Sequence, residues 1–132
     1  MEIIIAILGL LVAILTFWYS FYRKPKEELE HFIVQFKSTQ SISKQLQIEL
    51  ESFIQNANCG SEEMFRNITF DSYLEELKES YQQNLSDKLL EKVTNTNPTK
   101  SIILSMTRSL ENQFNEIQKI LIEIRIRNKE LK

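Results

Sequence analysis

The sequence predicts an all-α protein, with a single N-terminal transmembrane helix followed by a small cytosolic helical bundle that is oligomeric. Two glycines and two prolines in 132 residues leave few turns. Leucine, isoleucine, glutamate, glutamine and lysine dominate, and these residues favour long helices over a many-stranded sheet. We therefore divide the chain into an anchor (1–22), a juxtamembrane helix with a connector (23–40) and a cytosolic helical domain (41–132).

The anchor is predicted from an uncharged run over residues 3–22. A helix of that length spans roughly 30 Å, which matches the hydrocarbon thickness of a bilayer. A cleaved signal peptide is the alternative, but it would begin with positive residues and end in small ones. Here Glu2 lies at the start, and aromatic and then basic residues follow the apolar run, as at a membrane interface. The predicted interface residues are Trp18, Tyr19, Tyr22, Arg23, Lys24 and Lys26.

The orientation of the anchor follows from its flanking charges. All the nearby basic residues lie on the C-terminal side. The positive-inside rule places that side in the cytoplasm. We therefore expect a single-pass membrane protein with its N-terminus outside and residues 23–132 in the cytoplasm. The reverse orientation would make Asn67 and Asn84 glycosylation sequons. It would also describe an exported structural protein, similar in organisation to the phage spanins that tether two membranes.

Several helices are expected after the anchor. Residues 26–37 have amphipathic helical spacing, a polar stretch over 37–43 interrupts it, and the spacing resumes over 42–54. Residues 46–51 also alternate as a strand would, although their glutamine, glutamate and leucine residues favour helix. A turn of helix is expected near residues 61–63. A capping box at 72–75 begins another helix, whose apolar spacing continues to residue 89, and an Asn-Pro turn marks residues 94–101 as a loop.

The last segment has apolar residues at alternating spacings of three and four, which is the pattern of a coiled-coil seam. Extra isoleucines widen the apolar face, so that a bundle within one chain or between subunits would bury it. The stretch 120–127 alternates as a strand would and is rich in β-branched residues, but we favour helix. The predicted oligomer seam consists of Leu110, Phe114, Ile117, Leu121, Ile124 and Asn128.

Catalytic and metal chemistry lack a recognisable basis in the sequence. One histidine and one cysteine provide no metal-ligand or nucleophile–base spacing, and no glycine-rich loop precedes a helix. We therefore expect no enzymatic activity and no cofactor. Residues 23–132 carry 16 basic and 17 acidic residues. That balance argues against general nucleic-acid binding.

Two basic clusters are candidate anion sites. One precedes the last predicted helix, where backbone N–H groups favour negative charge. The other lies near the C-terminus and includes arginines, which suit bidentate phosphate contacts. Either cluster could hold a lipid headgroup, a cyclic nucleotide or an acidic partner. The alternative is that residues 49–91, with ten acids and three bases, simply pack against the basic final helix. The candidate residues are Thr99, Lys100, Ser101, Arg125, Arg127 and Lys129.

Two functions are compatible with these features. The first is a non-enzymatic, membrane-anchored helical module whose cytosolic domain oligomerises or binds a protein partner. The second is a ligand-gated membrane effector, organised like some prokaryotic antiviral defence proteins. In that case a small anionic ligand such as a cyclic nucleotide binds the basic clusters, and the assembled anchors perturb the membrane. No motif assigns the chain to a family.

Overall fold

The computed structural model describes residues 9–14 and 26–131, and these are mostly helical, which confirms the all-α fold class. Residues 9–14 form a short helical stretch. The remaining elements, in chain order, are α2 (Lys26–Ala57), β1 (Glu63–Phe65), β2 (Ile68–Thr69), α3 (Phe70–Asn84), α4 (Asp87–Asn95) and α5 (Lys100–Glu130).

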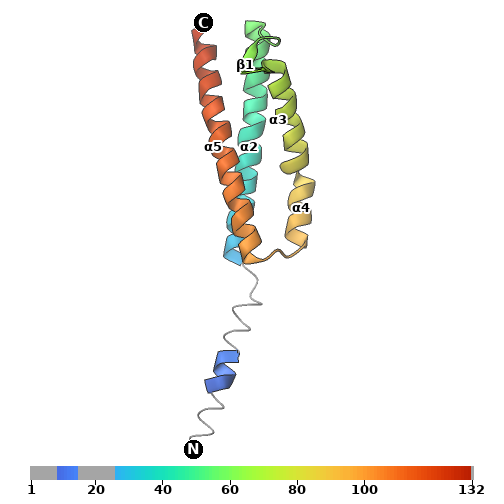
Figure 1. Cartoon of the computed structure of the whole chain (residues 1–132), viewed down its shortest axis with the longest axis vertical. Coiled ribbons are helices and arrows are strands. Elements are labelled where there is room, and N and C mark those ends of the chain that lie inside the picture. The colour runs from blue at the N-terminus through green and yellow to red at the C-terminus, as the bar shows by residue number, and fades with distance from the viewer. Residues whose placement is uncertain (1–8, 15–25, 132) are drawn as a thin grey trace, which may run out of the picture.

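The long helices α2 and α5 lie side by side and run in the same direction (Figure 1). Each residue of an α-helix advances the chain by about 1.5 Å, so both helices are long rods. Helices α3 and α4 return in the opposite direction along α2, so that the chain runs up, down and up again (Figure 1). An ion pair between Lys100 and Glu28 joins α5 to α2 at one end, and another between Arg125 and Glu49 joins them near the other.

The predicted anchor falls largely outside the described residues, together with Trp18, Tyr19, Tyr22, Arg23 and Lys24. Within residues 9–14 and 26–131, no helix has both the length and the apolar character needed to cross a membrane. Lys26 is the first residue of α2 and is exposed. The described part of the anchor exposes the large apolar side chains of Leu10, Leu11, Val12 and Ile14.

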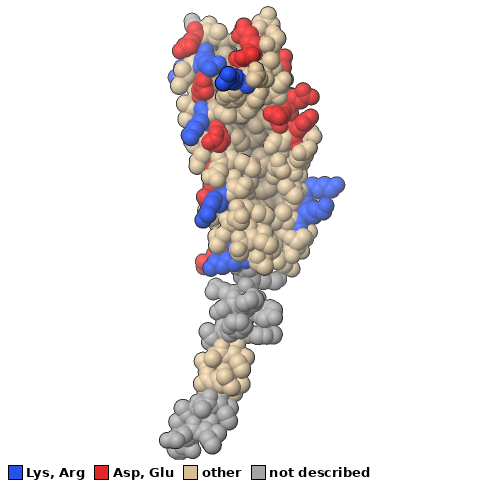
Figure 2. Space-filling model, viewed as in Figure 1, with Lys and Arg blue, Asp and Glu red and all other residues tan. Residues whose placement is uncertain are grey.

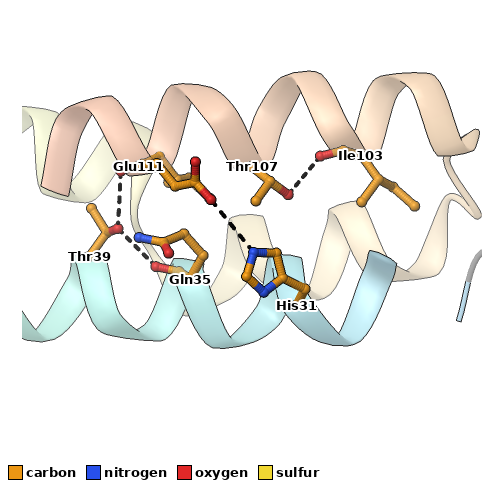
Figure 3. A network of polar contacts seen from close by, with 7 residues as sticks. His31, Gln35, Thr39, Ile103, Thr107 and Glu111 are labelled. Atoms are coloured by element: carbon orange, nitrogen blue, oxygen red, sulfur yellow. Dashed lines mark hydrogen bonds and ion pairs between the residues drawn. The ribbon is translucent and has the colours of Figure 1, made fainter. Parts of the chain in front are cut away.

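Helix α2 is continuous, so the predicted interruption over residues 37–43 is wrong. Three polar residues of that stretch, Thr39, Gln40 and Ser43, are buried inside the bundle. The Thr39 hydroxyl lies 2.8 Å from the Gln35 carbonyl oxygen and 3.4 Å from that of Leu110 in α5 (Figure 3). Ser43 is small enough to be buried between helices. Polar side chains that find partners within the core do not end a helix.

The buried polar residues Thr39 and Gln40 of α2 lie between two separate apolar clusters. The proximal cluster, near the start of α2, has Thr107 of α5 beside it, whose hydroxyl donates to the Ile103 carbonyl oxygen (Figure 3). The buried residues of the proximal cluster are Phe32, Phe36, Leu85, Ile103 and Leu110. Those of the distal cluster are Ile42, Leu46, Leu50, Phe53, Cys59, Phe70, Leu77, Ile117, Leu121 and Ile124.

A β-hairpin closes the distal end, where we expected a turn of helix, so that prediction is wrong. Strands β1 and β2 pair antiparallel, and Asn67 turns the chain between them with a φ of 66°. After α2, Asn58 takes the left-handed conformation with a φ of 50°. Asparagine tolerates that region because its short polar side chain bonds locally. A side chain on Gly60 would meet the Asp71 carboxylate, which would have to move aside.

Helices α3 and α4 together form a return arm. This arm starts earlier than predicted and is interrupted between the two helices. Helix α3 begins at Phe70, because the Thr69 hydroxyl accepts a hydrogen bond from the Ser72 N–H and caps it. The arm breaks between α3 and α4, at Leu85 and Ser86. The ambiguous stretches 46–51 and 120–127 are helical, as we favoured, and the loop between α4 and α5 contains the predicted Asn-Pro turn.

Candidate interaction surface

The predicted oligomer seam lies inside the chain. Leu110 belongs to the proximal cluster, and Ile117, Leu121 and Ile124 belong to the distal one. Phe114 is half-buried against the distal cluster, and Asn128 is half-buried near the end of α5. These side chains face α2 and the return arm of their own chain. Most of the predicted seam is therefore occupied by contacts within the chain.

A groove between α3 and α5 is one such surface. A hollow of about 340 Å³ lies between these two helices, and buried Ser43 of α2 forms part of its lining. The apolar part comes from Leu77, Leu85 and Ile117. The rim is polar and consists of Ser80, Ser109, Asn112, Gln113 and Glu116.

This arrangement suits the docking of a helix. An amphipathic helix binds by laying its apolar face into a hydrophobic groove, with polar contacts along the edges. The rim serines Ser80 and Ser109 are small and exposed. Figure 2 shows few charged side chains on the face between α5 and α3. The groove was not predicted from the sequence, where the available signal was a small serine, Ser43, among the apolar positions of its helix.

The C-terminal basic cluster is engaged in ion pairs. The Arg125 guanidinium donates to both carboxylate oxygens of Glu49, at 2.9 and 3.0 Å, and this hydrogen-bonded pair raises the pKa of Arg125. Arg127 pairs with Glu123 at 2.8 Å, and its guanidinium lies 6.0 Å from the centre of the Phe70 ring. Lys129 is exposed. An anion bound by Arg125 or Arg127 would compete with Glu49 or Glu123.

The other basic cluster lies at the opposite end of the bundle. The Thr99 hydroxyl caps α5 by accepting from the Ile102 N–H, and Lys100 lies 3.3 Å from a Glu28 carboxylate oxygen. Ser101 is exposed. Because a helix advances by about 1.5 Å per residue, the stretch of α5 from Lys100 to Arg125 separates the two clusters by roughly 38 Å. The two clusters therefore cannot bind one small ligand together.

An acidic face lies along α3 and the hairpin. Glu75, Glu76 and Glu79 line a shallow pocket together with Asn67 and Ser72. Figure 2 shows carboxylates gathered on the side of the molecule opposite α5. Among the described residues, no group of three or more His, Cys, Asp and Glu side chains is placed to hold a metal ion.

Three further titratable groups are Cys59, Tyr73 and His31. Burial, with a smaller contribution from Glu62, raises the pKa of the Cys59 thiol. A raised pKa makes the thiolate, the reactive form, scarcer at neutral pH. Burial beneath the hairpin, followed by Glu116 and Glu76, raises the pKa of Tyr73 to about 12. His31 is exposed and its Nε2 lies 3.5 Å from a Glu111 oxygen on α5 (Figure 3).

Comparisons with protein-family models, with curated proteins and with solved structures found no match to this chain. The interpretation of the groove therefore depends on its own geometry and chemistry.

Proposed function

We propose that this protein is a single-pass, membrane-anchored and non-enzymatic module whose helical bundle self-associates through the groove between α3 and α5. The observation that carries the proposal is this groove, which has an apolar lining and a polar rim. Most residues predicted as the seam are buried within the chain, so the groove is a candidate for the surface through which copies associate. A two-fold dimer would place the same surface of both copies together.

The apolar run over residues 3–22 supports the membrane part of the proposal. Its described residues expose Leu10, Leu11, Val12 and Ile14. Such exposure is costly in water and favourable in lipid. Anchoring also favours weak association, because tethering raises the effective concentration of one copy near another. The proposed orientation places the N-terminus outside and the bundle in the cytoplasm.

The anchor and its orientation can be tested with reporter fusions. Alkaline phosphatase is active outside the cytoplasm, and green fluorescent protein fluoresces inside it. With either reporter fused after residue 132, we expect fluorescence and no phosphatase activity, with the protein in the membrane fraction. Replacing Leu11 and Ile14 by lysine should release the protein from the membrane. An active phosphatase fusion would contradict the orientation, and wild-type protein in the soluble fraction would contradict the anchor.

The groove can be tested by filling it. Ser109 is exposed on the rim, so that Ser109→Trp should obstruct a docked helix while leaving the core intact. We expect the full chain in mild detergent to sediment as a dimer or larger assembly, and Ser109→Trp to shift it to monomer. Asn115→Trp places the same ring at an exposed position of α5 that does not line the groove. This control should stay assembled. A monomeric wild type, or equal effects of both variants, would contradict self-association through the groove.

The ligand-gated effector stays a prediction. Thermal unfolding of the full chain with a panel of cyclic nucleotides would test it, because a ligand at about 100 times its dissociation constant stabilises the folded state by roughly 2.7 kcal/mol. Arg125→Ala combined with Arg127→Ala should abolish such a shift if the C-terminal cluster binds the ligand. The absence of a shift with every nucleotide would count against this function.

A further inference from the structure

The return arm has a joint where α3 meets α4. Helix α3 ends with the Leu85 N–H bonded to the Tyr81 carbonyl oxygen, and Leu85 has a φ of −130°. Helix α4 then starts afresh, capped by the Ser86 hydroxyl, which accepts a hydrogen bond from the Leu89 N–H. The two helices therefore share no continuous ladder of hydrogen bonds. At its other end, α4 is joined to α5 by the short loop that contains Asn97.

One side chain of α2 holds both sides of this joint. The Gln40 amide nitrogen donates to the Leu85 carbonyl oxygen at 2.6 Å and to the Asp87 carboxylate at 2.9 Å. Gln40 and Leu85 are both buried. Leu85 lies at the end of α3, and Asp87 is the first residue of α4. The single amide therefore fixes the direction in which α4 leaves α3.

Helix α4 is held less firmly than the helices around it. It has no buried residue, whereas α3 buries Phe70 and Leu77, and α5 buries six residues. Its apolar side chains, Leu89, Leu90 and Val93, are only partly buried where they pack against the proximal cluster. They nevertheless help to cover that cluster, whose aromatic residues come from α2. The distal cluster contains no residue of α4, so lifting α4 would leave that cluster in place.

We infer that α4 is a cover that opens locally, between the Leu85–Ser86 joint and the loop at Asn97, while the rest of the bundle stays folded. Opening breaks the Gln40 hydrogen bond to Asp87 and exposes an apolar surface around Phe32 and Phe36. Segments that open locally are those with few buried apolar contacts, and α4 meets this description. The inference depends on the bundle alone and would survive if the anchor or the groove were disproved.

Hydrogen exchange on the full chain in mild detergent, measured across a series of low urea concentrations, tests the cover. Local opening exposes little surface, so its exchange rate changes little with urea, whereas global unfolding responds strongly. We expect α4 amides, such as the Leu90 N–H, to exchange faster than those of α5 and with little urea dependence. If the α4 amides exchanged at the same rate as the α5 amides and with the same dependence on urea, the inference would be overturned.

A pair of variants tests the role of Gln40. Gln40→Met keeps much of the side-chain volume and removes both hydrogen bonds, so α4 exchange should accelerate roughly tenfold. Exchange of α5 amides that requires global unfolding should accelerate by a similar factor, because unfolding also breaks these bonds. Gln47→Met is the control, because Gln47 lies on the same helix and donates to Ser43 rather than to the joint. Unchanged exchange of α4 in the Gln40→Met variant would overturn the inference, because α4 would then open without breaking these bonds. If that variant failed to fold, the urea series on the wild type would still decide.

Discussion

Helices α4 and α5 are capped in the same way, but the rest of the bundle buries them to very different extents. Each is capped by a hydroxyl, that of Ser86 for α4 and that of Thr99 for α5, and each has an amphipathic pattern. Yet α5 is the far longer helix and buries six of its residues, whereas α4 buries none. A cap and a pattern determine where a helix forms. The area that its neighbours cover determines how firmly it is held.

The largest expected effect comes from truncating the same residue type in the two regions. Leu46 of α2 is fully buried in the distal cluster, beside residues of α5. Leu46→Ala should therefore lower the free energy of unfolding by about 2–5 kcal/mol. Leu90 in α4 is only partly buried, so Leu90→Ala should cost about 1 kcal/mol. Urea unfolding of the full chain followed by circular dichroism would measure both. Equal losses would remove the distinction between the two regions.

A smaller effect, confined to high pH, should sharpen the comparison within the return arm. Tyrosines in the unfolded chain have a pKa of about 10. In the folded chain, the pKa of Tyr73 in α3 is raised to about 12. Unfolding therefore releases a proton in this window, and stability falls as the pH rises through it. After allowance for partial exposure, we expect a loss of roughly 1–2 kcal/mol by the upper end of the window.

The control for this prediction is Tyr73→Phe, in which that part of the pH dependence should disappear. Tyr81 lies further along the same helix and is partly buried, with the Lys44 ammonium group 5.2 Å from the centre of its ring. Comparison with Tyr81→Phe therefore distinguishes the contribution of Tyr73 to the pH dependence of stability from the titration of tyrosines and lysines in general. A pH profile that is the same in the wild type and the Tyr73→Phe variant would contradict a firmly packed α3.

The smallest effect should come from the ion pair that joins α5 to α2 near the distal end. Arg125→Gln and Glu49→Gln, alone or together, should change the melting temperature within the error of the measurement, because exposed ion pairs are screened by water and salt. Arg108→Gln is a matched change at another exposed position of α5. If only the Arg125→Gln variant lost the activity of the protein, with its stability unchanged, the result would indicate that Arg125 binds a ligand.

Apolar spacing predicted secondary structure best where it extended over many residues. The three-and-four spacing along residues 107–131 correctly predicted a helix, even though residues 120–127 also alternate as a strand would. The same spacing could not show which surface it faces. A seam that packs against α2 of its own chain has the same pattern as one that packs against another copy. The candidate groove was equally hidden, because its lining comes from three helices that are distant in sequence.

The polar residues led to the least reliable predictions. Local propensity suggested that residues 37–43 end a helix and that the arm after residue 72 is unbroken, and both expectations were wrong. In the structure these two errors are linked by one contact. Gln40 stays within α2, and its amide satisfies the Leu85 carbonyl oxygen at the break. A buried polar group is tolerated only where a partner meets it, and a linear sequence does not show that partner.

Composition, spacing and capping residues were enough to predict that this protein is helical, where most of its helices lie, and that an apolar stretch precedes them. Each of these signals acts over a few neighbouring positions, so it can be read along the chain. The parallel course of α2 and α5, the internal position of the supposed seam and the joint at Leu85 emerged only from the folded chain. Those outcomes depend on burying apolar faces and pairing polar groups across the bundle, and such contacts join residues far apart in the chain.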